Sequence, residues 1–591
     1  VMKVALVTNN GKETLSSLVI DIALDYLSFR AVEAGATVSM EIVGQCEAPS
    51  LEYSTDLAEW TKFDFSNPQT ITLENVGDKV YWRNTGKSDT FSPADDENYI
   101  HFNLGSKKIA AQGNIMSLLD SECEMTELPE DATFVQLFYK DSTLISAPEL
   151  PATKLSEACY YFMFCRCYSL QTAPELPAIT MEPSCYFGMF SYCTSLKEAP
   201  ELPAETLANA CYYQMFAWCS SLEVAPELPA LTMEPYCYCV MFLNCTSLKE
   251  APELPAETLA QGCYYQMFDG CESLEVAPKL PALKVVSDCY VDMFRNCTSL
   301  VEAPALPATE LAQTCYYCMF QNCSSLEEAP ELPAGKMEYG CYFSMFDGCS
   351  ALKKAPKLPA MELDDYCYFA MFLNCSSLKE APALPATQLT LSCYQGMFFG
   401  CSSLEEAPEL PATELAQQCY CQMFSGCSSL KEAPELKATK MSLLCCNLMF
   451  SNCSSLKNAP ELPAAYLAPG CYDSMFADCT ALERAPELPA TTLADFCYAE
   501  MFLNCISLTE APKLPARELV DECYLGMFHG CTNLEYIKVG FDDWGISSTT
   551  EDWLLNVAPE GTFECPEGLA VQYGDSYIPN GWSVNGAAPV A

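Results

Sequence analysis

The stretch "CYYQMFDGCESLEVAPKLPA" (residues 263–282) repeats "CYYQMFAWCSSLEVAPELPA" (residues 211–230) almost letter for letter. Its first cysteine recurs every 26 residues from Cys159 to Cys523, without insertion, and a second cysteine follows eight residues after each. These are fifteen copies, and one weaker copy without either cysteine begins at Thr133. A strict period of this length predicts a solenoid, in which each copy buries its apolar face against its neighbours.

Positions within a copy are numbered from the first cysteine as zero. Apolar residues at positions 0, 1, 4, 5 and 8 fit one face of a short helix. Position 7 is often Gly or Asn, as at Gly270 and Asn296, which is typical of a helix end. Positions 10 to 14, as in Ser247 to Ala251, indicate a short parallel strand that two prolines per copy keep short. The copies therefore predict an α/β solenoid of short helices and short parallel strands.

The letters Met293-Phe294 and Cys297 to Leu300 resemble the "AF..C..L" pattern of the BspA-like bacterial leucine-rich repeats. The resemblance covers about residues 133–535. It implies a leucine-rich-repeat solenoid on a surface-exposed protein that binds a partner through its repeated face.

Three parts are expected along the chain. Residues 1–120 alternate apolar and polar residues between turn signals, which predicts a β-sandwich with a connector to the repeats. Residues 121–535 form the solenoid. Residues 536–591, with a short helix near Thr549, form a capping module. The first 18 residues lack the charged head and cleavage site of a secretion signal.

The cysteine columns at positions 0 and 8 leave three interpretations open. Joint loss of both cysteines in the Thr133 copy favours disulfides within copies, as in extracellular proteins. A two-turn helix between them would hold the Cα atoms near or beyond the roughly 7 Å limit for a bridge, which favours buried thiols. Metal binding is disfavoured, because the Cys315–Cys318 spacing has no partner pair. The columns begin with Cys159, Cys167, Cys185, Cys193, Cys211, Cys219, Cys237 and Cys245.

Near-identical copies make the variable positions informative about function. Positions 2, 3, 6 and 7 point away from the apolar face of the expected helix, and several carry aromatic residues where a solvated face would carry Lys, Glu or Ser. Such a stripe is a candidate contact surface. The candidate binding residues are Tyr161, Phe162, Phe187, Tyr192, Tyr213, Trp218, Tyr265, Arg295, Tyr317 and Phe399.

Composition narrows the function classes. The net charge of −48 argues against nucleic acid and anionic membranes as partners, and no apolar stretch is long enough to span a bilayer. Two histidines in different parts, His101 and His529, and the lack of any catalytic motif argue against an enzyme or a cofactor. We therefore expect an extracellular or cell-surface binding protein with a protein or glycan ligand.

The alternative is a structural subunit. End domains could join copies of the chain into a filament or a phage fibre, since a head-to-tail contact that does not close gives an open fibre. The apolar run "SLVIDIALDYLSF" (residues 17–29) is the predicted joint.

Overall fold

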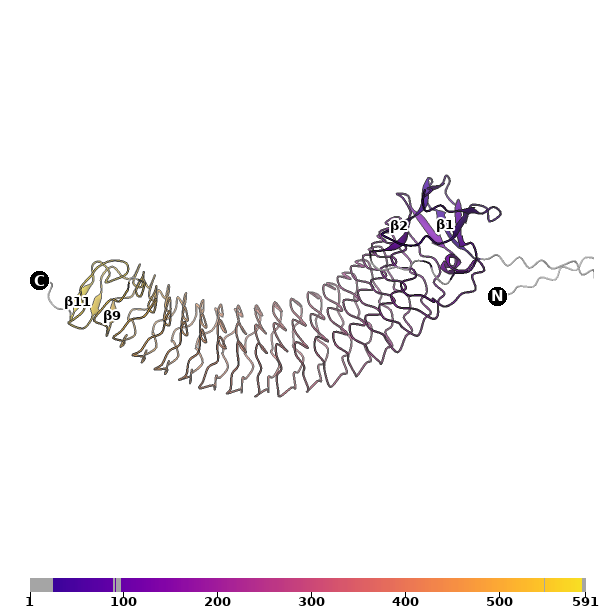
Figure 1. Ribbon diagram of the computed structural model, residues 1–591. Helices are drawn as coiled ribbons and strands as arrows, with labels where there is room; N and C mark the ends of the chain where they lie inside the picture. Colours follow the sequence, from indigo (N-terminus) through magenta and orange to yellow (C-terminus); the bar gives the residue numbers. More distant parts are fainter. Residues whose placement is uncertain (1–24, 89–90, 92–96, 547, 587–591) are drawn as a thin grey trace, which may run out of the picture.

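The chain forms a curved row of stacked coils with a sheet domain at its amino end and a small sheet at its carboxyl end (Figure 1). This computed structural model describes residues 25–88, 91, 97–546 and 548–586. Each 26-residue copy is one coil, called a rung below. The secretion-signal prediction for residues 1–18 and most of the predicted filament joint lie outside the described residues.

The short helices predicted for the copies are absent, so the prediction of an α/β solenoid was wrong. Among the described residues the only helix is the 3-10 helix η1 (Ile115–Leu118), which precedes the repeats. Positions 0 to 8 of each rung form consecutive four-residue turns instead. Strands of three or four residues within the copies are also absent, and single parallel bridges at positions 13 and 21 take their place, such as Glu302–Glu328 and Thr180–Thr206.

Backbone hydrogen bonds explain why this turn structure is stable. The N–H groups at positions 1, 3, 5 and 7 donate to carbonyls of the following rung, as from Tyr160 to Cys185 (3.0 Å) and from Phe164 to Met189 (2.9 Å). The N–H groups between them turn back three residues, as from Met163 to Tyr160 (3.2 Å). Alternate donors thus hold the rung together and join it to its neighbour, which satisfies buried backbone groups without a helix.

The turns require a left-handed residue every fourth position. In the Cys159 rung the φ angles of Ala158, Phe162 and Arg166 are 52°, 50° and 65°, at positions −1, 3 and 7. Glycine adopts this conformation without strain, and it recurs at all three positions, as at Gly262, Gly396 and Gly530. The apolar pattern that predicted a helix therefore has a period of four.

The interior is built from columns of identical residues. Phenylalanines at position 5, from Phe138 to Phe528, stack with ring centroids 5.2–5.7 Å apart and planes within 9°. Tyrosines at position 1 form a second buried column, which Cys446 interrupts between Tyr420 and Tyr472. Offset-parallel rings at such spacing attract each other beyond their area of burial. We call the phenylalanine stack the inner phenylalanine column.

Two antiparallel sheets cover the amino end of the solenoid. Phe102, on β7, packs on Phe29 of β1 and stacks on Phe138, so the inner phenylalanine column continues into this domain. One sheet has the strand order β4-β3-β6-β1-β8 and the other β5-β2-β7. The strands are β1 (Leu27–Ala31), β2 (Ala36–Val43), β3 (Leu51–Ser54), β4 (Thr61–Lys62), β5 (Ile71–Leu73), β6 (Lys79–Asn84), β7 (Tyr99–Asn103) and β8 (Ile109–Gln112).

The carboxyl end continues the solenoid beyond the sequence period. The N–H groups of Tyr524 and Phe528 donate to Thr549 and Trp553, with the same offset as between earlier rungs. The helix predicted near Thr549 is therefore wrong: these residues form one more rung, with Thr549 and Val557 in the cysteine positions. A parallel sheet of order β11-β10-β9 completes the cap, with β9 (Tyr536–Lys538), β10 (Thr562–Glu564) and β11 (Ser583–Asn585).

Candidate binding face

Position 2 carries a half-buried aromatic column along one edge of the solenoid. Its first ladder is Tyr161–Phe187–Tyr213, with centroids 4.7 and 4.5 Å apart. Its second is Tyr317–Phe343–Phe369, with centroids 4.5 and 4.4 Å apart. Between the ladders, Tyr265 lies between Cys239 and Val291. We call these seven rings the outer aromatic column: Tyr161, Phe187, Tyr213, Tyr265, Tyr317, Phe343 and Phe369.

A shorter aromatic tier runs beside the first ladder at position 7. The ring of Tyr192 stacks on Trp218 with centroids 5.5 Å apart and planes 3° apart, and the guanidinium of Arg166 lies 5.4 Å from the Tyr192 ring centre. Trp218 is 40% exposed. Phe162, at position 3, meets the Tyr161 ring edge-on at 4.6 Å. The rungs from Cys159 to Cys211 therefore present the densest aromatic surface.

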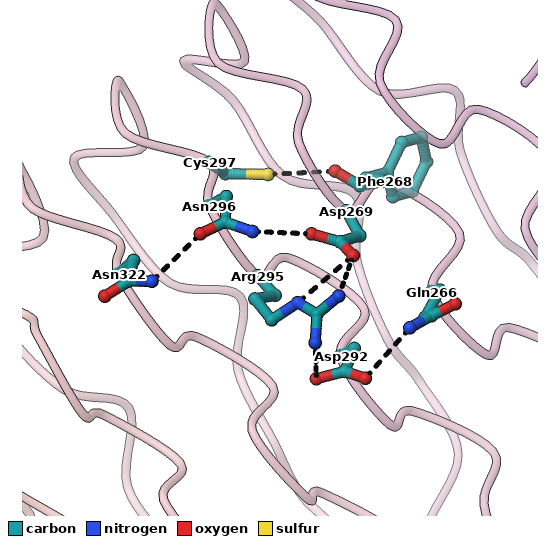
Figure 2. Close-up of polar contacts among 8 residues, drawn as sticks. All are labelled: Gln266, Phe268, Asp269, Asp292, Arg295, Asn296, Cys297 and Asn322. Carbon is teal, nitrogen blue, oxygen red and sulfur yellow. Dashed lines mark hydrogen bonds and ion pairs between the residues drawn. The ribbon is translucent and has the colours of Figure 1, made fainter. Parts of the chain in front are cut away.

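A polar cluster centred on Arg295 lies in the Cys263 and Cys289 rungs, between the rungs of the two ladders. Figure 2 shows its polar contacts. The guanidinium donates to Asp269 Oδ2 from Nε (3.1 Å) and from one terminal nitrogen (2.6 Å), and its other terminal nitrogen lies 3.4 Å from Asp292 Oδ1. Gln266 donates to Asp292 Oδ2 (3.1 Å), and Asn296 donates to Asp269 Oδ1 (3.0 Å). Ion pairs and hydrogen bonds thus connect five residues from two adjacent rungs.

Burial sets the electrostatics of this cluster. Asp269 and Asp292 are 3% and 5% exposed, so both carboxyls depend on Arg295 and on amide donors for compensation. Burial raises the pKa of Asp292 and the Arg295 charge partly offsets this rise. The cluster is therefore mostly buried, and only part of the Arg295 side chain is exposed at the surface between the two ladders.

The structure brings most of the predicted binding residues together. Tyr161, Phe162, Phe187, Tyr192, Tyr213 and Trp218 form one surface, and Tyr265, Arg295 and Tyr317 continue it along the edge. Phe399 does not join this group, since it lies at position 6 between rungs that carry Leu373 and Ser425 there.

Sequence reasoning missed four residues of this edge. Phe343 and Phe369 complete the second ladder, and Asp269 and Asp292 hold Arg295. Each occupies the same repeat position as a predicted residue or lies one rung from it. Reading every position as a full column across all copies would have found them.

The second cysteine column has a specific bonding role. Each thiol at position 8 donates to the carbonyl of the phenylalanine at position 5 of the preceding rung, as from Cys193 to Phe164 (3.2 Å) and from Cys323 to Phe294 (3.0 Å). All fifteen copies make this bond, at 3.0–3.2 Å. The column therefore needs the protonated thiol as donor.

No disulfide joins any of the 38 cysteines in the structure, and only Cys46 and Cys123 are partly exposed. Burial raises the pKa of Cys185, Cys219 and Cys531 to about 12. In the first column Cys185 donates to Met181 Sδ (3.8 Å). Buried thiols of this kind are inert small apolar groups at neutral pH.

The described residues contain no cluster of three or more His, Cys, Asp or Glu that could hold a metal ion. They also contain no helix long and apolar enough to cross a membrane.

No family model, no curated protein and no solved structure matches this chain.

Proposed function

We propose that this chain is a non-enzymatic binding protein whose outer aromatic column, together with Tyr192 and Trp218, docks a protein partner. One observation supports this most. The column is aromatic in seven of the nine rungs from Cys159 to Cys367, whereas the same position holds Gln395, Cys421 and Asn447 in the rungs that follow. Because those rungs fold alike, the rings are dispensable for folding and available for contact.

The ring geometry favours a protein over a glycan at this edge. Sugars bind aromatic side chains through the ring face, and within each ladder the faces cover one another at 4.4–4.7 Å. A ring stacked on both sides therefore offers a partner its edge and not its face. Rigid aromatic side chains of this kind contribute contact area at low entropic cost, as in the hot spots of protein interfaces. A cell surface, or alternatively a phage particle, is the proposed location.

The first step of the test is to identify the partner by crosslinking. A photo-crosslinking amino acid is placed at residue 218 or, as matched control at position 7 of the polar half, at residue 478. Each protein is exposed to intact cells and to secreted proteins from candidate hosts, and the crosslinked protein is identified and purified. We expect crosslinking at residue 218 and not at residue 478.

Binding of the purified partner is then measured for Tyr213→Gln and Trp218→Asn, which introduce residues that other rungs carry at these positions. Each is expected to weaken binding by about 2 kcal/mol, roughly thirtyfold, with only a small loss of stability, and Asp478→Asn is expected to bind like the wild type. Crosslinks between copies of the chain alone would contradict the proposal and support the filament.

A further inference from the structure

The first rung departs from the repeat at position 8. Fifteen rungs carry a thiol there, and the Thr133 rung carries the carboxyl of Asp141. Asp141 is 9% exposed, and its Oδ1 accepts a hydrogen bond from the Leu104 N–H (3.1 Å), just beyond β7. Its Oδ2 is buried without a hydrogen-bond partner. A buried oxygen without a partner destabilises the fold, and the cysteine found at this position in the other copies would avoid that loss.

Asp141 lies in the wall of a pocket of about 320 Å³ between the sheet domain and the first rung. His101, across this pocket on β7, also has a buried nitrogen without a partner, Nδ1, while its Nε2 lies 3.9 Å from Glu41 Oε2 on β2. Buried polar atoms without partners are rare, and two in one pocket indicate a missing ligand. This junction pocket is lined by Tyr99, His101, Asn103, Gly105, Tyr139, Lys140, Asp141 and Ser142.

The charges around the pocket do not favour an ion. Burial raises the pKa of Asp141 well above its usual value, which disfavours the charged carboxylate that a cation would need. Burial also lowers the pKa of His101, so its imidazole is neutral at pH 7. Lys140 in the pocket wall and Glu41 beside His101 carry opposite charges. The interior therefore offers neutral donors and acceptors.

Two aromatic rings supply apolar surface in the same pocket. Tyr99 meets the His101 ring edge-on at 5.8 Å, and Tyr139 lies below the Lys140 ammonium at 4.5 Å. A pocket with aromatic walls and a few convergent polar atoms fixes the orientation of a small polar ligand.

We propose that the junction pocket binds one uncharged sugar ring, whose hydroxyls pair with Asp141 Oδ2 and His101 Nδ1 and whose apolar face packs on a tyrosine. This site is separate from the outer aromatic column and does not depend on the protein partner proposed above. It gives the first rung a role beyond covering the end of the solenoid.

The experiment titrates the full chain with free glucose, galactose, mannose and N-acetylglucosamine in the millimolar range, by calorimetry and by saturation-transfer NMR. We expect at least one of these sugars to bind. Asp141→Cys restores the residue of all fifteen other copies, so we expect an equal or higher melting temperature and affinity at least about tenfold lower, because the ligand hydroxyl loses its partner. Asp347→Asn, a half-buried carboxyl of the Cys341 rung, is the matched control.

His101→Phe is a second variant whose sugar affinity does not depend on how Asp141→Cys folds. The same loss of affinity is expected. Three results would overturn the proposal. None of the four sugars binds the wild type; or Asp141→Cys and His101→Phe, both folded, bind like the wild type; or Ca²⁺ or K⁺ binds at Asp141 and no sugar competes with it.

Discussion

Two aromatic columns run along this solenoid, and they differ in how continuous and how buried they are. The inner phenylalanine column passes through sixteen rungs without a substitution, from Phe138 to Phe528. The outer aromatic column is interrupted by Cys239 and Val291 and ends at Phe369. Both columns use stacked rings, but the inner rings are 0% exposed whereas the outer rings are half-buried. Ring stacking is therefore required for folding inside the solenoid and optional at its edge.

The largest expected effect comes from alkaline pH, which acts most strongly through the buried thiols of the interior. Burial raises the pKa of every repeat thiol except Cys445, to about 12 at Cys185, whereas thiols of the unfolded chain ionise above about pH 8.5. Unfolding then releases protons, so stability is full below that pH and falls as pH rises towards 12. At pH 10 the loss is about 2 kcal/mol for a buried thiol with a pKa near 12, such as Cys185. Denaturant unfolding measured from pH 7 to 10 checks this, and a flat profile would contradict it.

Truncating one inner ring is the next largest effect. Phe320→Ala should lower the free energy of unfolding by about 3–5 kcal/mol, because it leaves a cavity and removes the stacking contacts with Phe294 and Phe346. Since each rung contacts only its neighbours, the loss should be local. Hydrogen exchange followed by mass spectrometry should show faster exchange in the rungs from Cys289 to Cys341 and unchanged exchange near the ends.

The thiol–carbonyl bonds should contribute a smaller amount. Cys323→Ala removes the bond to the Phe294 carbonyl, whereas Cys315→Ala in the same rung removes a thiol that has no acceptor among the described residues. We expect Cys323→Ala to cost about 1 kcal/mol more than Cys315→Ala in urea unfolding. Equal costs would mean that position 8 requires only the volume of sulfur.

The outer column should tolerate the same change that damages the inner one. Phe343→Ala loses its contacts with Tyr317 and Phe369, and its cost should be about 1 kcal/mol because the site is half-buried. Phe343→Ala and Phe320→Ala both replace a stacked phenylalanine by alanine. The difference between their unfolding free energies therefore reports the effect of burial. A cost as large as that of Phe320→Ala would contradict an optional outer column.

The smallest effect is expected where the outer column ends. Gln395→Phe would add a ring next to Phe369 and extend the second ladder by one rung. The change in stability should lie within about 0.5 kcal/mol, as for most surface substitutions. Partner binding measured alongside would show whether the length of the ladder limits the affinity.

The sequence predicted the period, the stacking of copies and most residues of the outer edge, because these depend only on recurrence at 26 residues. It did not predict the turn structure. Over nine residues, apolar positions 0, 1, 4, 5 and 8 fit a helical period of 3.6 as well as a turn period of four. The distinguishing signal was glycine at positions −1, 3 and 7, as at Gly262, Gly396 and Gly400, since a helix excludes repeated left-handed residues.

Two other features lay beyond what the period could reveal. The last rung, at Thr549, keeps the backbone ladder after its cysteines, Met and Phe are replaced, so only hydrogen bonding identifies it. The junction pocket joins His101 to Asp141 across two parts of the chain, and no repeat pattern places residues from the sheet domain against a rung.

Thiol labelling followed by intact mass tests the central claim most directly. The freshly purified protein is alkylated without reductant, first folded and then in denaturant. Buried, protonated thiols that join the rungs predict labelling of Cys46 and Cys123 at most in the folded protein, and of all 38 cysteines after unfolding. Cysteines that stay unlabelled in denaturant until a reductant is added would show disulfides in place of the thiol–carbonyl column, and would contradict this account of what holds the solenoid together.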